Sequence, residues 1–228
     1  MKGSPSMGFI EKFKGTAKKY NHAWVFLYMF IYLPWFHYLE TRTNVTYYII
    51  HSPLDDYIPF LEIFIVPYLL WFLYMAVAAF YFFFTNKRDF YRLASFLVAG
   101  MTAFLVICTV FPNGLNLRPT SFARDNIFTV LVAKLYEADT STNVLPSIHV
   151  YNSLGIAIAI SHSKALKKHP RICLGTYILT ALIIMSTMFL KQHSVTDVTA
   201  GFVMAMVVYP LVYVNERNKE PKLSGQWV

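Results

Sequence analysis

The sequence predicts an all-α membrane protein that crosses the bilayer several times, because its composition does not suit a soluble fold. Of the 228 residues, 56% are hydrophobic and only 14% are charged, whereas soluble domains average about 25% charged residues. The mean hydropathy is +0.44. So few charged side chains cannot hydrate the surface of a globular protein of this size, so lipid is expected to solvate most of it.

Six apolar segments approach the roughly 20 residues that a helix needs to cross the hydrocarbon core. Backbone polar groups find no water there, so each segment is expected to be a helix. The fourth is the least apolar, because Asn152, Ser153 and several small residues interrupt it, and small residues suit packing against other helices. The six predicted helices are residues 21–39, 59–84, 91–111, 147–163, 172–190 and 194–214.

The distribution of basic residues predicts the orientation. Fifteen of the 20 Lys and Arg residues lie in the two termini and in two connections, residues 87–92 and 164–171. Cytoplasmic loops carry an excess of basic residues, so both termini are expected in the cytoplasm. The chain then divides into a cytoplasmic arm (1–20), a six-helix membrane domain (21–214) and a cytoplasmic tail (215–228). The basic clusters are separated by long apolar runs and form no single patch, which argues against nucleic acid as a partner.

The long outer connection, from Pro112 to Leu145, is large enough to hold structure of its own. Within it, Ile127 to Tyr136 places apolar residues at helical spacing, which predicts a short amphipathic helix in the membrane interface. Cys108 and Cys173 both lie in apolar runs without metal-ligand spacing, so neither a metal nor a cofactor is expected.

Three short polar stretches come together on the outer surface in this topology. They are Leu117–Pro119, Pro146–His149 and His193–Asp197. The last holds His193 and Asp197 at spacing i, i+4, which puts both on one helix face. An Asp behind a His sets the tautomer and leaves the other ring nitrogen free to react. The alternative is an interfacial His beside a helix-capping Asp.

The other two stretches predict an anion site. Ser147 is a candidate helix cap after Pro146, and the N–H groups at Ser147 and Ile148 would then favour a bound phosphate beside His149. The guanidinium fork of Arg118 matches phosphate oxygens. The alternatives are ordinary helix punctuation at residues 146–149 and an Arg that anchors to lipid headgroups.

These motifs resemble the type-2 phosphatidic acid phosphatase superfamily, whose pattern is K-x6-R-P, P-S-G-H and S-R-x5-H-x3-D on a six-helix membrane core. The resemblance covers roughly residues 90–214. Arg118-Pro119 ends the first motif, residues 146–149 form the second with Ile148 in place of Gly, and Ser186, His193 and Asp197 fit the third.

Two positions depart from that pattern, since Phe111 and Thr187 stand where Lys and Arg are expected. The stretch from Ser186 to His193 is also similar to the inositol phosphorylceramide synthase branch, whose members transfer a phosphoryl headgroup between lipids. A diester carries less charge than a monoester, which would suit a site with fewer cations.

The resemblance implies a covalent mechanism on a membrane lipid substrate. His193 would be the nucleophile, Asp197 would orient it, and His149 would be the acid and base. Arg118, Ser147 and Ile148 would bind phosphate, and Lys191 or Asn116 would compensate for the missing cations. The function expected is a lipid phosphatase with its site on the outer face of a cell membrane. The alternatives are a lipid phosphotransferase and a non-catalytic transporter or scaffold.

Overall fold

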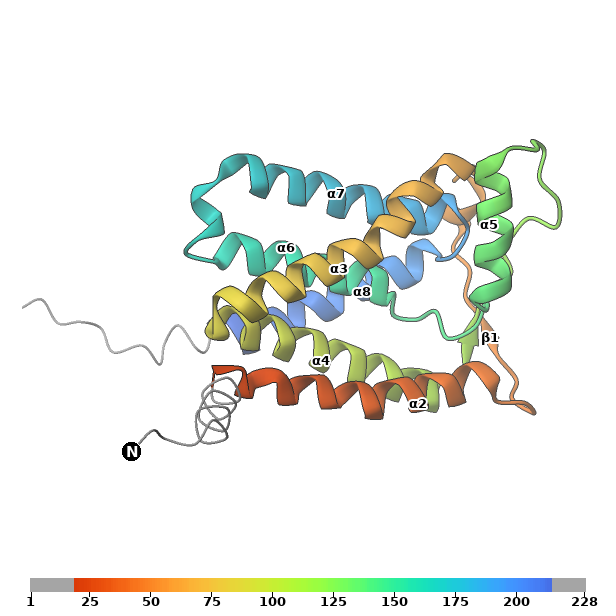
Figure 1. The fold of residues 1–228 in the computed structure, drawn as a ribbon. Coiled ribbons are helices and arrows are strands. Elements are labelled where there is room, and N and C mark those ends of the chain that lie inside the picture. The colour runs from red at the N-terminus through yellow and green to blue at the C-terminus, as the bar shows by residue number, and fades with distance from the viewer. Residues whose placement is uncertain (1–18, 215–228) are drawn as a thin grey trace, which may run out of the picture.

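The computed structural model describes residues 19–214, which form a bundle of helices with a polar cap at one end (Figure 1). Apart from Lys19 and Tyr20, the predicted cytoplasmic arm lies outside the described residues, as does the predicted tail. The helical elements are, in chain order, η1 (Asn21–Tyr28), α2 (Met29–Thr41), η2 (Pro53–Asp56), η3 (Glu62–Phe64), α3 (Ile65–Thr85), α4 (Lys87–Val110), α5 (Ile127–Ala138), α6 (Ile148–His162), η4 (Leu166–Lys168), α7 (Pro170–Phe189), α8 (Val195–Tyr209) and η5 (Pro210–Val214).

Four helices are long and apolar enough to cross a membrane: Glu62–Thr85, Lys87–Val110, Pro170–Phe189 and Val195–Val214. The prediction of a helical membrane protein is therefore confirmed. The other two predicted spans do not meet that length as single helices, because residues 21–41 divide into η1 and α2 and α6 has 15 residues. The count of six spans and the cytoplasmic termini stay predictions.

One predicted boundary differs by a full turn. The third apolar segment was expected to begin at residue 91, but α4 begins at Lys87. The side chain of Asn86 accepts hydrogen bonds from the N–H groups of Arg88 and Asp89, both at 3.0 Å. This cap stabilises a helix start in a polar stretch, where hydropathy alone carries no signal.

Helix α6 is the centre of the bundle and packs against α3, α4, α7 and α8. Small residues allow this close packing. A Cβ atom at Gly155 would lie 2.7 Å from the ring of Phe96, and one at Gly100 would meet the ring of Tyr151. Because protein surrounds it, α6 tolerates polar residues such as Asn152 and Ser153, both of which are buried. This agrees with the packing role predicted for the fourth segment.

The polar cap, called the α5 end here, is the end of the bundle where α6 and α8 begin and across which α5 lies (Figure 1). Two short strands, β1 (Tyr48–Ile49) and β2 (Asn113–Gly114), pair in parallel there. The side-chain oxygen of Asn113 accepts hydrogen bonds from the N–H groups of Val144 and Leu145 at 2.9 and 2.8 Å. These bonds fix the loop that leads into α6. Helix α5 occupies the predicted amphipathic segment, and its location in the membrane interface stays a prediction.

Candidate active site

The site forms where the first turns of α6 and α8 meet. The N–H of Ser147 donates to the backbone carbonyl of Asp197 at 3.0 Å. Gly201, one turn further along α8, permits this approach, because a Cβ atom there would lie 2.9 Å from the carbonyl oxygen of Ser147. A glycine in α8 therefore brings the second and third sequence motifs into contact.

His193 and Asp197 form a buried pair, although they do not share a helix face as predicted: α8 begins at Val195 with Ser194 as its cap, and His193 precedes it. The Nδ1 atom of His193 lies 2.8 Å from Oδ2 of Asp197, whose side chain is fully buried. An ionised carboxylate only accepts hydrogen bonds, so Nδ1 carries the proton. The Nε2 atom of His193 then has a free lone pair, and it faces Nδ1 of His149 at 3.4 Å. The three predicted catalytic side chains thus lie in one chain of contacts.

His149 lies against two aromatic side chains of α3 that were not predicted from the sequence. Its ring centroid is 4.9 Å from that of Tyr68 and 4.4 Å from that of Trp71. Trp71 Nε1 is shielded from water and has no acceptor among the described residues. A helix far from the three motifs thus forms one wall of the site, and no signal in the motifs could have identified these two residues.

The turn before His193 holds it in place through Thr187. The N–H groups of Gln192 and His193 both donate to the backbone carbonyl of Thr187, at 2.9 and 3.0 Å. Lys191 adopts a positive φ of 53° in this turn. The hydroxyl of Thr187 is buried and donates to the carbonyl of Ile184 at 2.7 Å. Thr187 therefore anchors the turn, at the position where the family pattern has an Arg.

A buried carboxylate that sequence reasoning missed, Asp55, holds the start of α8. It accepts hydrogen bonds from the hydroxyl of Ser194 at 2.6 Å and from the N–H of Val195 at 2.8 Å. Its carboxylate also caps η2 by accepting from the N–H of Ser52 at 2.8 Å. The Ser-Pro-x-Asp stretch at 52–55 is a recognisable helix-start signal, but it indicates only the local cap and not the contact with α8.

Lys191, predicted to supply a missing cation, is bound to the same loop. Its Nζ atom donates to the backbone carbonyl of Asp55 at 2.9 Å and also to that of Ile58. Burial lowers the pKa of this ammonium group, although the nearby Asp55 and Asp56 partly oppose the shift. In this structure the side chain therefore holds a loop in place.

Arg118 is also bound to backbone carbonyls. Its Nη1 atom donates to the carbonyl of Asp139 at 2.8 Å, its Nη2 atom donates to that of Thr140 at 2.8 Å, and Nη2 also donates to the side chain of Gln192. The guanidinium lies 4.6 Å from the ring centroid of Tyr136. A cation is favoured at the carbonyl-rich end of a helix, here α5. Through Gln192, Arg118 lies next to the turn that carries His193.

Asp139 adds a carboxylate to this side of the site. Its Oδ2 atom accepts a hydrogen bond from the hydroxyl of Tyr68 at 3.4 Å. Burial raises the pKa of this carboxyl, and the charges of Arg118 and His193 oppose the shift. A carboxylate at this place would oppose the binding of a highly charged anion at the candidate site.

The remaining predicted phosphate ligands differ in availability. Ser147 caps α6, because its hydroxyl accepts from the N–H of Val150 at 3.4 Å, and its own N–H is bonded to Asp197. The N–H groups of Ile148 and His149 lie in the first turn, where a helix offers no acceptor. Asn116 is exposed, and its side chain makes no hydrogen bond within residues 19–214. Ile148 and His149 therefore offer the backbone donors of the site.

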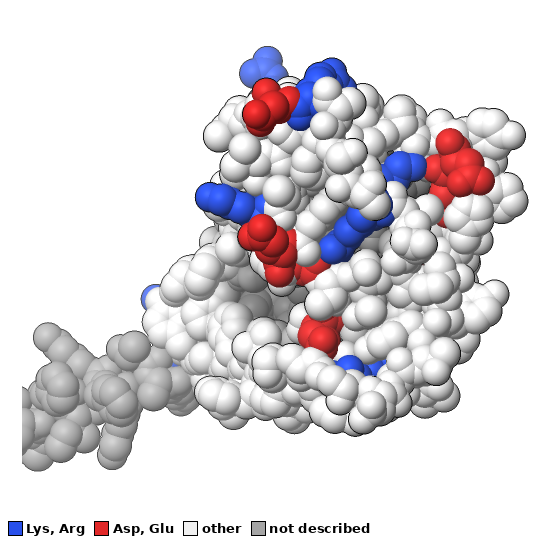
Figure 2. All heavy atoms as spheres, turned by 90° about the vertical axis from the view of Figure 1, so that its right-hand side faces the viewer, with Lys and Arg blue, Asp and Glu red and all other residues white. Residues whose placement is uncertain are grey.

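The charged side chains of this end surround a hollow in the surface. Figure 2 looks onto the α5 end and shows acidic and basic groups around the hollow. Phe111, at the position of the expected Lys, instead packs against Tyr48 with ring centroids 5.4 Å apart. Within residues 19–214, no group of three or more His, Cys, Asp or Glu side chains is arranged to hold a metal ion.

The fold and the site define a class: a helical membrane protein with two His residues and an Asp in contact at one end of the bundle. The family model described as PAP2 superfamily matches residues 93–221, more than half of the chain. The chain therefore belongs to the PAP2 superfamily, whose members are phosphatases or phosphotransferases, and the predicted superfamily is confirmed. No curated protein and no solved structure shows a significant match. The likeness to the inositol phosphorylceramide synthase branch stays a prediction.

Proposed function

We propose that the protein is an integral membrane lipid phosphatase that acts through a phosphohistidine at His193. The observation that carries the proposal is the contact chain from Asp197 to His193 and on to His149, with separations of 2.8 and 3.4 Å. Asp197 keeps the proton on Nδ1, so the lone pair on Nε2 of His193 is available for attack on phosphorus. Membership of the superfamily supports the reaction class.

The first step forms a bond between Nε2 of His193 and phosphorus and breaks the bond from phosphorus to the lipid oxygen. His149 gives a proton to that oxygen as it leaves. In the second step water attacks phosphorus, His149 takes a proton from the water, and the phosphorus–nitrogen bond breaks. Inorganic phosphate and free His193 result, so both histidines return to their starting states.

Phosphorus cannot fit between two nitrogen atoms that are 3.4 Å apart. Substrate binding must therefore displace the His149 ring along the wall that Tyr68 and Trp71 form. The N–H groups of Ile148 and His149 and the charge of Arg118 then stabilise the phosphate oxygens. Arg118 acts from a fixed position, because the carbonyls of Asp139 and Thr140 hold its guanidinium.

The proposal places the site on the outer face of a cell membrane, with six spans and cytoplasmic termini. The basic residues of the chain support this orientation. For the first span, residues 21–41 run alongside α4 in the same direction, because Asn21 bonds Lys87, Tyr28 bonds Thr102 and Trp35 bonds Thr109. A segment that follows a spanning helix in this way crosses the same depth. For the fourth, protein surrounds α6, so its shorter length and polar residues are compatible with a span.

A second candidate function is transfer of a phosphoryl headgroup from one lipid to an alcohol acceptor. The same intermediate would form, and the alcohol would replace water in the second step. The observation that favours transfer is the charge of the site: Phe111 and Thr187 lack the expected cations, and Asp139 adds a carboxylate. A phosphodiester carries one negative charge fewer than a fully ionised monoester and suits such a site better.

The test is a panel of lipid phosphate monoesters and diesters, with and without diacylglycerol, in which inorganic phosphate and new lipid products are measured together. Phosphate release from a monoester without acceptor supports the phosphatase, and a new diester product supports transfer. The controls are His193→Ala and His37→Ala. His37 is an exposed histidine on α2, and its replacement is expected to leave the rate unchanged. If His193→Ala turns over as fast as the unmodified chain, the proposal is wrong and a non-catalytic function is favoured.

A further inference from the structure

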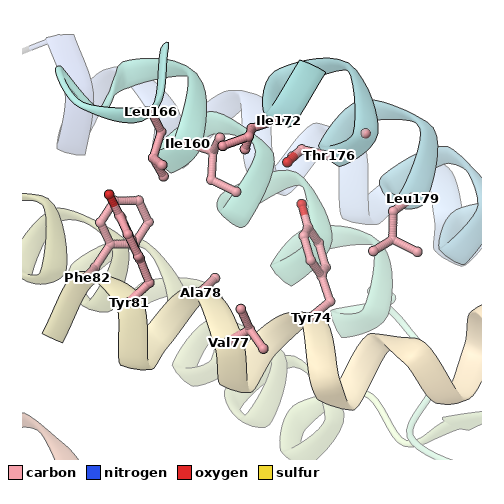
Figure 3. Close-up of a pocket in the computed structure, with 11 residues that line it drawn as sticks. Tyr74, Val77, Ala78, Tyr81, Phe82, Ile160, Leu166, Ile172, Thr176 and Leu179 are labelled. Atoms are coloured by element: carbon pink, nitrogen blue, oxygen red, sulfur yellow. The ribbon is translucent and has the colours of Figure 1, made fainter. Parts of the chain in front are cut away.

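An apolar groove lies on the side of the bundle between α3, α6 and α7. Its volume is ≈ 400 Å³, within the range of roughly 300–1,000 Å³ typical of small-molecule sites. Figure 3 shows side chains from all three helices that point into one space, with Tyr74, Val77 and Ala78 on α3 and Ile160 and Leu179 opposite. The lining is almost wholly hydrocarbon and aromatic, which suits a hydrocarbon chain.

A glycine forms part of the α7 wall of the groove. Gly175 is one of the lining residues, and a Cβ atom built there would meet no other atom within 4 Å. The position therefore has room for a larger side chain at the wall of the groove. This gives a direct way to fill the groove.

Packing contacts of Trp71 connect the candidate active site with the wall of the groove. The Trp71 ring lies 4.4 Å from His149 and also packs against the hydrophobic cluster that contains the lining residues Tyr74, Ala78 and Phe82. Its Nε1 donor is shielded from water and unpartnered among the described residues. A buried donor without an acceptor is costly, and here it lies between the histidines and the groove.

The direction of the groove also fits this order. Tyr74 is three residues after Trp71 on α3, and Phe82 lies eight residues further. A helix rises about 1.5 Å per residue, so the lining runs for roughly 12 Å along the bundle axis, away from His149. The order along α3 is therefore phosphate site, unpartnered N–H donor and apolar groove.

We propose that this groove receives a hydrocarbon chain of the lipid substrate while its phosphate lies at His193 and His149. The Trp71 N–H donates to an oxygen atom that links the phosphate to the chain. This inference rests on the proposed function and adds the part of the substrate that the site recognises. Chains in the surrounding lipid are as apolar as the groove, so the groove serves to orient the substrate rather than to attract it.

The first test compares Gly175→Phe with Ala181→Phe, which adds the same ring to α7 at an exposed position outside the groove. Both variants are assayed on lipid phosphates with sixteen-carbon and four-carbon chains in the same mixed micelles. We expect Gly175→Phe to lower kcat/KM about tenfold for the long chain and to leave the short-chain value unchanged. The Ala181→Phe variant is expected to match the unmodified protein on both. An equal loss on both chains, or no loss on either, overturns the proposal.

A substitution of Trp71 adds a second measurement. Trp71→Phe keeps an aromatic ring beside His149 and removes only the indole N–H. The expected result is an increase in KM of about three- to tenfold, the equivalent of one lost hydrogen bond, on substrates with an oxygen at the linkage. No change in KM would remove Trp71 from the proposal.

The last test needs no turnover and so separates the groove from the chemistry. A lipid phosphate with a diazirine at the chain end is photolysed with the His193→Ala protein, and the labelled peptides are mapped. Labelling of residues 74–82 or 172–179, suppressed by Gly175→Phe, is the expected result. Labelling of other residues overturns the groove proposal and leaves the proposed function standing. The control probe is a phosphatidylglycerol with a diazirine at its chain end. If this probe labels the groove and the lipid phosphate does not displace it, the groove proposal is also wrong. If the groove is labelled but His193→Ala remains fully active, the proposed function fails instead.

Discussion

His193 and Arg118 lie in one polar network at the α5 end, joined through Gln192, yet their side chains are used differently. One nitrogen of His193 is held by Asp197, and the other faces His149. The two terminal nitrogens of Arg118 are both bound, to the carbonyls of Asp139 and Thr140 and to Gln192. His193 is therefore oriented by Asp197 with Nε2 facing His149, whereas the guanidinium of Arg118 holds the end of α5.

This difference indicates how the site manages charge. Lys191 resembles Arg118 in this respect, because its ammonium group is bound to the carbonyls of Asp55 and Ile58. In the proposed mechanism, backbone N–H groups at the start of α6 therefore carry more of the phosphate charge than in the family pattern. If His193 attacks phosphorus as proposed, the site is well ordered but weakly cationic, and we expect it to favour substrates of low charge.

The largest effect is expected when the orientation of His193 is disturbed. Asp197→Asn replaces an acceptor that sets the tautomer of His193 with an amide that also presents N–H groups. We expect the rate to fall by about 10⁴, as when the orienting Asp of a catalytic triad is replaced, with the folded bundle retained. Initial rates and the midpoint of thermal unfolding measure the two effects. A rate within tenfold of the unmodified protein would contradict the assigned role.

The second effect tests the Arg118 side. Arg118→Ala removes both the charge beside the His193 turn and the donors to three backbone carbonyls. We therefore expect the rate to fall by about 10² and the unfolding midpoint to drop. Arg118→Lys keeps the positive charge but lacks the planar guanidinium with its several donors. Compared with Arg118→Ala, it should therefore recover part of the rate but little of the stability. The control is Arg124→Ala, because Arg124 is largely exposed and pairs with Glu62. A full rate with Lys at 118 would mean that charge alone matters.

The third effect concerns Asp55, which holds the start of α8. Asp55→Asn places N–H groups against Ser194 and Val195, which both need an acceptor, so α8 loses its anchor. We expect a loss of roughly 3 kcal/mol in the free energy of unfolding and a rate about tenfold lower. Asp56→Asn is the matched control, since Asp56 is exposed and its carboxylate bonds the exposed His51. Equal behaviour of the two variants would show that Asp55 does not position His193.

The smallest effect is a pH dependence at Asp139. Burial raises the pKa of this carboxyl above its ordinary value of 3.8. The folded state then binds the proton more tightly than the unfolded state, so ionisation of Asp139 lowers stability. We compare the free energy of unfolding of the unmodified protein with that of Asp139→Asn. The unmodified protein should lose stability relative to the variant as the pH rises through the pKa of Asp139 in the folded state. Below about pH 4 the difference between the two proteins should be constant. Thermal unfolding across this range measures the difference, and a difference that does not vary with pH would contradict it.

Much of the fold and part of the site were predictable because they depend on residues that are close together in the sequence. Apolar runs near 20 residues identified the four helices that are long and apolar enough to cross a membrane, and the spacing of four residues brought His193 and Asp197 to attention as a pair. Ser147 was recognisable as a cap, and the superfamily followed from three motifs. The start of α4 was missed because the Asn86 cap lies in a polar stretch, where hydropathy has no contrast.

By itself the sequence determined a helical membrane protein of the PAP2 superfamily, along with the residues that were expected to react. Tertiary structure alone decided which groups those residues meet. Asp55 bonds Ser194 across 139 positions, and Gly201 lets α8 approach Ser147. The side chains of Arg118 and Lys191 donate to backbone carbonyls of distant segments. Helix α3 contributes Tyr68 and Trp71 to the site and one wall of the groove. The physical reason is that helical periodicity encodes contacts between near neighbours, whereas contacts between distant segments depend on how loops and helices pack in space.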